Sequence, residues 1–530
     1  MNLNKEQRCA VESNHSKILC LAGAGTGKTQ TMISRICRLV NEGVNIRNIL
    51  ALTFTNAAAF EMQERFKKLS GRDDSPEFRT FHSFCYSLIA ADVKVRNEIG
   101  YSSVPSIAEE SEIQRIELSC RNLLGIKKSM KSLKYSNNLT DRNNLKLLEK
   151  SMKKEFKKRN LITFDILCYD VCMLFVNDVP SVHRYKNKYQ YIFVDEFQDT
   201  DPKQWNFVKS FQESNLFIVG DALQAIYKFR GADSSIIKSL SRDDSWEVIR
   251  LVQNYRSTQK ICACANRLSS TYADPSYSVD IVSTKDAGDD VTWKRTNTSR
   301  YILVSQVDEL LGDWKLHNEP ECAILCRTNS EVDQLADILT DKGVSFSRKS
   351  KDNHIEHFIK SLDDDKYALY WLLSILPSSE QSKFLRSESI SDSEELDPQV
   401  KLIRFISTYS TGKILTWWKL IMECRKAASC NDISSIIRMF TSVDDRVSYF
   451  AEDLDKLSTY DDIRNYVLEH MNKSEESKIY VGTIHSSKGL EYNTVYLLNV
   501  GSPSFKLNGE ENNNLFYVGI TRAKERLYIA

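Results

Sequence analysis

The chain has 530 residues, of which 42% are hydrophobic and 27% charged, and its formal net charge is +1 at pH 7. This length exceeds what one hydrophobic core supports and predicts three or four domains of roughly 150 residues each. A net charge near zero gives no whole-molecule argument for nucleic-acid binding, so any basic surface has to be local. The N-terminus has no apolar signal core and no run of about 18 apolar residues occurs, which predicts a cytoplasmic protein with no membrane contact.

Short runs rich in Ile, Val and Leu alternate with longer amphipathic stretches along the chain. Runs of this kind, buried on both faces, are typical of parallel sheets in α/β proteins. They fall into two groups, one before about residue 258 and one after about residue 320, which predicts two α/β cores. The predicted strands are 18–21, 49–53, 191–194, 216–219, 248–251, 323–326, 479–482, 495–500 and 526–529.

Two long regions interrupt this pattern, at about 88–188 and 377–476, and both are predicted to be mainly helical. Within the first, residues 127–159 carry twelve Lys or Arg against three acids. Such a run is either a solvated helix face or a surface that contacts phosphates. The second region opens on a Ser- and acid-rich stretch, 378–397, which is typical of a connecting loop.

The thirteen cysteines include no Cys-x-x-Cys pair. Zinc and iron–sulfur sites usually have such local spacing, which this chain lacks. Most of the cysteines stand among apolar residues, where a thiol behaves as a small hydrophobe. The sequence therefore predicts reduced core thiols.

A glycine-rich loop lies near the N-terminus, between a predicted strand and a predicted helix over 29–40. It reads A-G-A-G-T-G-K-T, the pattern of a phosphate-binding loop with Ala at the first glycine position. Backbone N–H groups of such a loop face the phosphates, Lys28 would reach the terminal ones, and Thr29 would ligate Mg²⁺. The residues predicted to bind ATP in this loop are Ala22, Gly23, Ala24, Gly25, Thr26, Gly27, Lys28 and Thr29.

Two acids end the apolar strand in YIFVDEFQDT. Asp195 is placed to complete the Mg²⁺ shell, and Glu196 to orient and deprotonate an attacking water. Two carboxylates at the end of a buried strand are costly without a cation. Because a kinase needs no base for water, the Asp-Glu pair predicts ATP hydrolysis.

With its remaining motifs, the chain resembles superfamily 1 DNA helicases of the UvrD/Rep/PcrA type. The matching segments follow the family's order: LNKEQ (3–7), LTFTNAAAFEMQER (52–65), RTFHSF (79–84), VDEFQDT (194–200), VGDALQAIYKFRGAD (219–233), QNYRS (253–257), GTIHSSKGLEY (482–492) and LFYVGITRAKERL (515–527). The resemblance implies an α/β fold of two RecA-like parallel-sheet motor domains with two mainly helical insertions. It assigns 1–87 and 189–258 to the first core (1A-like), 88–188 to an insertion (1B-like), 259–376 and 477–530 to the second core (2A-like), and 377–476 to a short insertion (2B-like).

The resemblance also implies roles for further residues. Gln7 would read the adenine, Tyr255 would stack on it, and Glu491 would contact ATP. Arg256 and Arg522 resemble arginines that neutralise charge on the transferring phosphoryl group. Gln224 resembles the γ-phosphate sensor, and it completes the predicted catalytic set of Lys28, Glu196, Gln224, Arg256 and Arg522.

Single-stranded DNA is held by phosphate contacts and by aromatic stacking. The candidates for this contact are Phe54, Thr55 and His82 in the first core, Tyr227 and Phe229 in the coupling segment, and His485 in the second core. Ordinary core packing is the alternative for each aromatic residue. If both cores grip one strand while ATP closes the cleft between them, each hydrolysis cycle becomes a step along DNA.

The chain departs from the family pattern at three places. Ala57 stands where the family usually has Lys, Ala222 and Leu223 replace polar or acidic residues, and 512–514 is Asn-Asn-Asn in place of an acid–arginine run. None of these changes removes a predicted catalytic group. They leave open how the protein grips duplex DNA.

The principal hypothesis is an ATP- and Mg²⁺-dependent DNA helicase that moves 3′ to 5′ and acts on single-stranded DNA and single-/double-strand junctions, as a monomer or weak dimer, in replication, repair or recombination. The alternative is a DNA-stimulated ATPase that unwinds or senses DNA ends only with a protein partner, in a defence or recombination complex. A non-catalytic scaffold should have lost Lys28 or Glu196, and the chain keeps both. An RNA substrate stays open, since a contact to a 2′-hydroxyl cannot be read from one sequence.

Overall fold

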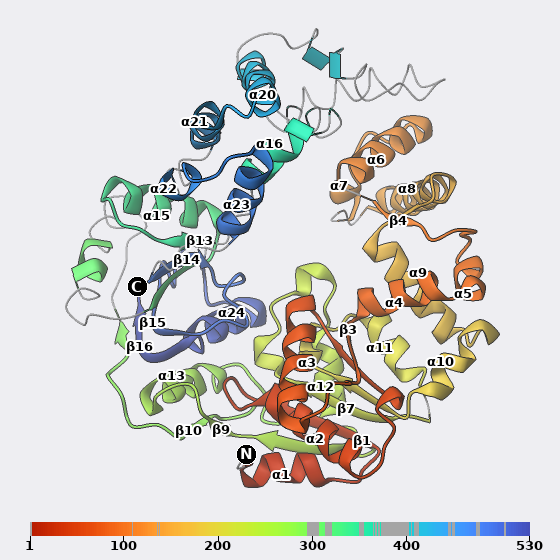
Figure 1. The fold of residues 1–530 in the computed structure, drawn as a ribbon. Coiled ribbons are helices and arrows are strands. Elements are labelled where there is room, and N and C mark those ends of the chain that lie inside the picture. The colour runs from red at the N-terminus through yellow and green to blue at the C-terminus, as the bar shows by residue number, and fades with distance from the viewer. Residues whose placement is uncertain are drawn as a thin grey trace. The chain divides into compact units, whose positions relative to one another are not determined.

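The computed structural model describes residues 3–293 except 109, 135, 137 and 212, residues 307–312, 321–348, 354–363, 413–443, 451–472 and 478–530 except 503 and 504, and the single positions 365, 368, 372, 402, 403, 405, 406 and 447. These residues form two compact units (Figure 1). The first unit combines Met1–Val104, Phe164–Lys349 and Ser477–Ala530, and the second combines Pro105–Thr163 and Ser350–Glu476. None of the helices in the described part of the chain is long and apolar enough to cross a membrane.

The first unit contains a six-stranded, fully parallel sheet in the order β3-β2-β6-β7-β1-β8. Its strands are β1 (Lys17–Ala22), β2 (Ile49–Thr53), β3 (Glu77–Thr80), β6 (Tyr191–Val194), β7 (Asn215–Gly220) and β8 (Glu247–Leu251). The accompanying helices are α1 (Lys5–Glu12), α2 (Lys28–Asn41), α3 (Asn56–Ser70), α4 (Phe81–Ala91), α5 (Val93–Glu98), α9 (Phe164–Val176), α10 (His183–Lys188), α11 (Pro202–Lys209) and α12 (Ser234–Leu240).

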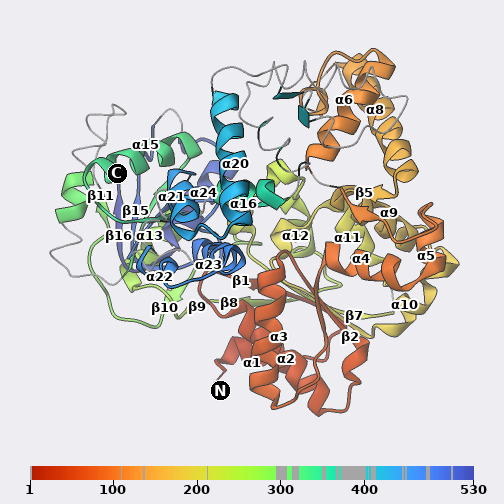
Figure 2. The same cartoon turned by 45° about the horizontal axis from the view of Figure 1, so that its top comes forward.

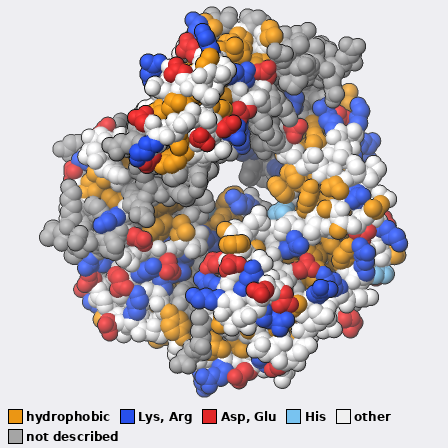
Figure 3. Space-filling model, in the orientation of Figure 1, with side chains coloured by type: hydrophobic (Ala, Val, Ile, Leu, Met, Phe, Trp, Pro, Cys, Tyr) orange, Lys and Arg blue, Asp and Glu red, His pale blue; other side chains and the backbone are white. Residues whose placement is uncertain are grey.

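The core of this sheet forms because its central strands are apolar on both faces. Ile18 and Cys20 of β1 pack with Met32 and Ile36 of α2 on one face, and the buried Leu19 faces the other, since side chains alternate along a strand. Both views show α2 and α3 side by side over this sheet (Figures 1 and 2). On the face of this core seen in Figure 3, basic and acidic side chains are interspersed.

A second parallel sheet lies in the same unit, in the order β11-β16-β15-β12-β14-β13. Its elements are β11 (Thr292–Trp293), β12 (Cys322–Cys326), β13 (Ser347–Arg348), β14 (Ile479–Thr483), β15 (Tyr492–Leu497) and β16 (Ala523–Ile529), with helices α13 (Gln259–Ser269), α15 (Asn329–Asp341) and α24 (Glu510–Ile520). Ile324 of β12 and Val481 of β14 pack with Leu335 and Ile338 of α15. The short parallel pair β9 (Gln253–Asn254) and β10 (Val282–Ser283) lies where the chain leaves the first sheet.

Among its described residues, the second unit is helical apart from the short pair β4 (Ser106–Ile107) and β5 (Leu161–Ile162). Its helices are α6 (Glu110–Leu124), α7 (Met130–Lys134), α8 (Leu139–Lys158), α16 (His354–Asp363), α20 (Lys413–Ser429), α21 (Ile433–Val443), α22 (Ala451–Leu454) and α23 (Tyr460–Asn472). One apolar cluster joins α16, α20, α21 and α23 through Phe358, Ile421, Phe440 and Ile463.

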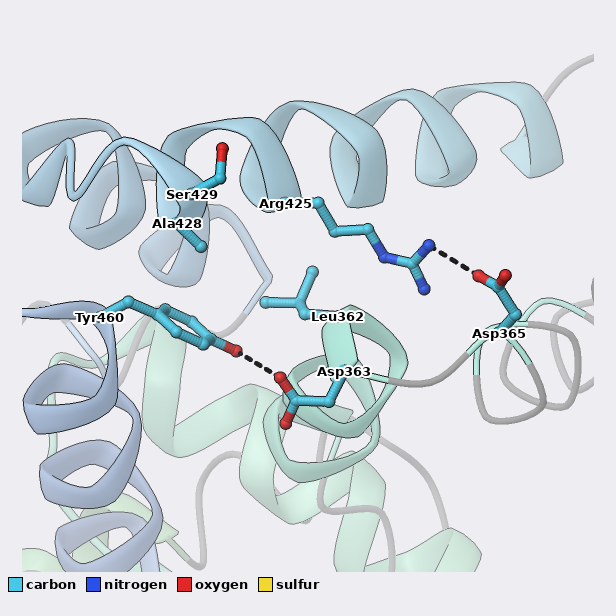
Figure 4. A pocket seen from close by; sticks show the side chains of 7 residues that line it. All are labelled: Leu362, Asp363, Asp365, Arg425, Ala428, Ser429 and Tyr460. Carbon is cyan, nitrogen blue, oxygen red and sulfur yellow. Dashed lines mark hydrogen bonds and ion pairs between the residues drawn. The ribbon is translucent and has the colours of Figure 1, made fainter.

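A pocket of about 480 Å³ opens between α16, α20 and α23 of the second unit. Figure 4 shows two polar pairs among its lining side chains. Arg425 lies 2.7 Å from Asp365, and the Tyr460 hydroxyl donates to the Asp363 carboxylate at 3.3 Å. Since these groups satisfy each other, the pocket gives no argument for a ligand.

The predicted fold class is confirmed: the protein is α/β, with two parallel sheets and mainly helical interruptions. The predicted strand 495–500 was misplaced, because β15 covers Tyr492–Leu497 and Asn499 then adopts a left-handed φ of 60° that ends the strand. Strand β3 and the two-residue strands were not predicted. The predicted loop 378–397 lies outside the described residues.

Candidate functional site

The phosphate-binding loop joins the end of β1 to the start of α2, as predicted. Gly25 and Gly27 have φ values of 68° and 80°, which side chains other than glycine rarely adopt. A Cβ atom on Gly25 would also lie 2.8 Å from the Asn254 amide nitrogen. The first turn of α2 reads K-T-Q-T and contains no acid, so nothing opposes anion binding at the positive end of the helix.

Lys28, Thr29 and Asp195 meet beside this loop. The Lys28 ammonium donates to the Ala22 carbonyl at 3.2 Å, and the Thr29 hydroxyl donates to the Asp195 carboxylate at 3.4 Å. Burial, reinforced by the neighbouring Glu196, raises the pKa of Asp195 to about 7. A hydroxyl and a carboxylate are the hard oxygen ligands that Mg²⁺ prefers, so these two side chains fit that ion.

Glu196 has a left-handed backbone, with φ 48° and ψ 42°. Such a conformation in a residue other than glycine costs of order 1–3 kcal/mol and is concentrated at functional sites. Burial alone would raise its pKa, but Lys28, Lys488 and a hydrogen bond donated by Gln198 at 2.5 Å outweigh burial and bring the pKa to about 2. Glu196 is therefore ionised at neutral pH, which is the form that a base requires.

A chain of hydrogen bonds leads from Glu196 to Arg522. The Gln198 carbonyl accepts from the Asp221 backbone N–H at 2.9 Å, and the Asp221 carboxylate accepts from the Gln224 amide at 2.7 Å. The side-chain carbonyl of Gln224 then accepts from the Arg522 guanidinium at 3.4 Å. The path crosses from the first sheet to the segment between α24 and β16.

Arg522 is 2% exposed, although it is a charged residue. Its guanidinium donates to the carbonyls of Leu490 and Val518 at 3.1 and 3.0 Å. Burial, together with Arg256, lowers its pKa to about 9, so the side chain stays charged at neutral pH. A buried arginine of this kind supplies positive charge in a low-dielectric environment, where electrostatic stabilisation is strong.

Arg256 reaches the same region from β9 and the residues after it. Asn254 fixes this segment, because its carbonyl accepts from the Arg256 N–H at 2.8 Å and its amide donates to the Ala24 carbonyl at 2.7 Å. The Arg256 guanidinium donates to Glu491 at 2.6 Å and to the Thr521 carbonyl at 3.0 Å. The predicted ATP contacts Arg256 and Glu491 therefore form an ion pair.

Gln7 and Tyr255 flank the loop near the start of α2. The Gln7 amide is buried and donates to the Thr26 carbonyl at 3.1 Å. Asn4 caps α1 in a reciprocal capping box with Gln7, and its amide donates to the Tyr255 hydroxyl at 2.9 Å. The Tyr255 side chain is 44% exposed, which leaves its ring open for stacking.

Three of the predicted DNA-contact residues form one aromatic group. The ring centroids of Tyr227 and Phe229 lie 6.0 Å apart, and the His485 ring lies 6.5 and 5.7 Å from them. Burial and the nearby Arg327 lower the pKa of His485 to about 4, so this imidazole is neutral. Phe229 is 57% exposed, which ordinary core packing does not explain.

The other predicted DNA-contact residues follow β2 and β3, which are neighbours in the first sheet. Phe54 lies against Phe81 with centroids 6.2 Å apart, and His82 lies 5.6 Å from Phe164. The Thr55 hydroxyl accepts from the Ala58 N–H at 3.1 Å as the N-cap of α3. Thr55 thus has a structural role that its sequence position did not indicate.

A buried ion pair between Lys488 and Asp199 was missed by the sequence analysis. The Lys488 ammonium lies 2.5 Å from the Asp199 carboxylate, with side-chain exposures of 8% and 2%. It donates to the backbone carbonyl of Gln224 at 2.9 Å. It also lies 4.8 Å from the centre of the Tyr227 ring. Asp199 belongs to the motif VDEFQDT and Lys488 to GTIHSSKGLEY, but neither motif indicates that the two residues pair.

One of the departures from the family pattern lies where α24 contacts the segment after β7. The Asn514 amide donates to the carbonyls of Ala222 and Ala225, both at 3.2 Å, and its carbonyl accepts from the Tyr272 hydroxyl at 2.9 Å. An uncharged amide therefore makes three hydrogen bonds at this position. Ala57 is exposed on α3.

Two family models match the chain in succession. The first, "UvrD/REP helicase N-terminal domain", covers residues 3–245, and the second, "UvrD-like helicase C-terminal domain", covers 249–361 and 347–530. The ATP-dependent DNA helicase PcrA of Bacillus subtilis is 28% identical over 99% of this chain and 82% of its own length. The probable DNA helicase II homolog of Mycoplasma pneumoniae is 27% identical over 99% and 83%, and a PcrA of Staphylococcus epidermidis is 26% identical over 100% and 83%.

Proposed function

Because the chain belongs to the UvrD/REP helicase family, we propose that it is an ATP-dependent DNA helicase that moves 3′ to 5′ along single-stranded DNA and opens duplex at single-/double-strand junctions. The observation that carries this proposal is the hydrogen-bonded path from Glu196 through Gln198, Asp221 and Gln224 to Arg522. It links a base for water in one core to a positive charge in the other.

In this proposal Glu196 takes a proton from the attacking water, and Arg522, Arg256 and Lys28 stabilise the charge that develops on the phosphoryl oxygens. Gln224 lies between Asp221 and Arg522 and senses whether the terminal phosphate is present. Thr29 and Asp195 would hold Mg²⁺, which would neutralise phosphate charge when bound. The ionised form of Glu196 at neutral pH and the burial of Arg522 are consistent with these roles.

Coupling to DNA follows from the neighbours of Gln224. Its backbone carbonyl accepts from Lys488, whose ammonium also lies over the Tyr227 ring. A shift of Gln224 with the bound nucleotide would therefore change the contacts of the aromatic group Tyr227, Phe229 and His485, on which bases stack. We propose the four-domain assignment given by the sequence as the frame for this movement.

The helix α8 supplies a candidate duplex contact. It buries Leu148, Met152 and Phe156, and its exposed residues include a series of five basic side chains spaced four apart. This series, the α8 basic series, consists of Arg142, Lys146, Lys150, Lys154 and Lys158. Spacing by four places neighbours about 6 Å apart along one side of a helix, which suits repeated phosphate contacts.

A second candidate function is a DNA-stimulated ATPase that unwinds only with a protein partner. The observation that favours it is length: the match to the Bacillus subtilis relative runs over 615 aligned positions, whereas this chain has 530 residues. The relative therefore carries segments that this chain lacks. Cytoplasmic location and a monomeric or weakly dimeric state belong to both candidates.

The test of the proposed chemistry is phosphate release with and without single-stranded DNA. We expect DNA to stimulate release by the natural chain, and Glu196→Gln to lower the rate by about 10²–10⁴-fold while binding of a non-hydrolysable ATP analogue persists. Glu64→Gln, an exposed change on α3, is the matched control and should leave the rate unchanged. Equal rates for Glu196→Gln and the natural chain would overturn the proposal.

A further inference from the structure

Three cysteines from distant parts of the sequence meet inside the first unit. Cys85 lies on α4, and Cys168 and Cys172 lie on α9, one helical turn apart. Their sulfur atoms all lie within 4.8 Å of one another, and the Cys168 and Cys172 sulfurs are 3.9 Å apart. The three residues are 0%, 7% and 1% exposed. Figures 1 and 2 both show α4 and α9 side by side.

This gathering is unusual for the chain. In the part that the structure describes, these are the only three Cys, His, Asp or Glu side chains with ligand atoms grouped this closely. Other buried cysteines, such as Cys262, Cys322 and Cys424, each lie in a separate place, where burial raises the thiol pKa. Those thiols act as small apolar side chains. Three thiols at one point have a different chemistry available.

His82 is the candidate fourth donor, although its ring nitrogens do not lie within 4.8 Å of all three sulfur atoms. His82 precedes Cys85 by one turn on α4, so both side chains lie on the same side of that helix. Its ring lies 5.6 Å from the ring of Phe164, which precedes Cys168 by one turn on α9. The His82–Phe164 contact and the thiol group are thus successive layers between the same two helices.

Buried aromatic side chains of the same helices lie near the thiols, and so does a polar one, since the Gln204 side chain of α11 hydrogen-bonds to Cys168. Phe84 precedes Cys85 on α4, and Phe175 lies one turn after Cys172 on α9; their ring centroids are 6.3 Å apart. The ring centroid of Phe207, on α11, lies 4.9 Å from that of Phe175. Water is poorly accommodated in such surroundings, which strengthens metal–thiolate bonds and protects them from exchange.

We propose that Cys85, Cys168 and Cys172 bind one thiophilic metal ion of the Zn²⁺ class, with His82 as the fourth ligand. Tetrahedral zinc with sulfur at about 2.3 Å places sulfur atoms about 3.8 Å apart, so the present spacing needs a contraction of less than about 1 Å. On binding, each of the three thiols gives its proton to solvent and becomes a thiolate ligand. The ion would join α4, which carries the predicted DNA contact His82, to α9.

Nothing in the sequence indicated this site, because metal-binding cysteines are usually recognised from Cys-x-x-Cys pairs, which this chain lacks. Here two of the cysteines, Cys168 and Cys172, are four residues apart on α9, and the third, Cys85, lies on α4. The pattern FHSFC followed by CYDVC contains the donors, but only the packing of α4 on α9 brings them together.

The test is a titration of the full-length, reduced and chelator-treated chain with Co²⁺, which reports thiolate ligands by charge-transfer absorption. We expect saturation at one ion per chain with an intensity typical of three thiolates, and loss of the band when Zn²⁺ is added. The triple change C85A/C168A/C172A should lose the band, and the matched triple change C262A/C322A/C424A, which removes as many buried thiols, should keep it. His82→Ala should keep the thiolate band but weaken the affinity by roughly 10-fold or more, since even outer-shell partners are worth about 10–100-fold.

A natural chain that develops no thiolate band at excess Co²⁺ overturns the proposal, and this result requires no variant to fold. A band of unchanged intensity in C85A/C168A/C172A also overturns it, because the ligands would then be other residues. If that triple variant does not fold, Cys85→Ala alone gives the answer, since it should reduce the band to the intensity of two thiolates.

Discussion

At the scale of single residues, two adjacent carboxylates are tuned in opposite directions. Burial raises the pKa of Asp195 to about 7, whereas Lys28, Lys488 and Gln198 overcome the effect of burial and bring that of Glu196 to about 2. Neighbouring acids with pKa values pushed apart are the usual sign of separate roles. Here the difference in pKa suits a role for Asp195 as a ligand of a cation and a role for Glu196 as a base for water.

Replacement of Arg522 tests the second half of the site. Arg522→Lys keeps a positive charge but loses the planar fork that donates to Leu490, Val518 and Gln224. We expect ATP turnover to fall by about 10³-fold or more, since arginines that stabilise the transferring phosphoryl group are worth about 10³–10⁵. Arg242→Lys, at an exposed ion pair with Asp274, is the control. Turnover of Arg522→Lys within a few-fold of the natural chain would remove Arg522 from the catalytic set.

The raised pKa of Asp195 predicts how the need for Mg²⁺ depends on pH. Mg²⁺ binds the ionised carboxylate, so protons compete with it below a pH of about 7, and we expect the Mg²⁺ concentration for half-maximal ATPase to rise by about 10-fold per pH unit there. Above that pH the requirement should be flat. Glu196 stays ionised throughout, since its pKa is about 2. A requirement that does not change between about pH 8 and pH 6 contradicts the assignment of Asp195 to the metal.

The roles of residues could be predicted from the sequence where a short local motif determines them. Lys28 and Thr29 follow from the loop, and Asp195 and Glu196 from the end of a strand. Gln198, Asp221 and Lys488 stood in the same motifs, but their roles depend on partners that only folding brings near, such as Asp199 for Lys488 at a separation of 289 positions. Cys85 was interpreted as an ordinary thiol for the same reason.

At the scale of elements, the central strands were the easiest to predict. β1, β2, β6 and β7 have neighbours on both sides and helices over their faces, so they are almost wholly apolar. β3 lies at the edge of the first sheet and reads E-F-R-T with three of its four residues only half-buried. Because a periodic apolar signal is absent from an edge strand of this kind, sequence alone gave no reason to place it.

Helix α8 gives the element-scale prediction. If the α8 basic series binds phosphates, changing its five residues to Gln should make DNA affinity less sensitive to salt, by about 0.9 in the log–log slope for each phosphate that is no longer neutralised. The matched variant changes the four lysines to Arg and should keep the slope, because the charge is kept. Titrations of labelled 3′-tailed duplex at several salt concentrations measure it. An unchanged slope in the Gln variant would leave the series as a solvated helix face.

At the scale of the whole molecule, the two sheets of the first unit are joined by polar contacts as well as by the chain. Three such contacts connect residues more than 230 positions apart in the sequence. They are Lys488–Asp199, Arg256–Glu491 and Arg522–Gln224. Hydrogen bonds and ion pairs of this kind have good geometry only in one arrangement of the two sheets. They are therefore suited to a movement that a bound nucleotide controls.

The buried pair Lys488–Asp199 tests this coupling. Lys488→Met leaves Asp199 buried without a partner, and we expect a loss of about 3–5 kcal/mol in unfolding free energy, with most of it recovered in Lys488→Met/Asp199→Asn. The same single change should weaken stimulation of the ATPase by DNA, since Lys488 also lies over Tyr227. Lys285→Met, at the more exposed pair with Glu525, should cost less than about 1 kcal/mol. Additive effects of the two changes would show that the pair is not coupled.

The most direct test of the central claim is unwinding of short duplexes that carry a 3′ tail, a 5′ tail or no tail, in DNA and in RNA, by the purified chain with ATP and Mg²⁺. The proposed function predicts strand separation of 3′-tailed DNA, none with Glu196→Gln, and little on 5′-tailed or blunt duplex. Stimulated ATP hydrolysis without unwinding of any substrate would favour the partner-dependent ATPase. The absence of both activities, in a folded chain that binds ATP, would contradict the account.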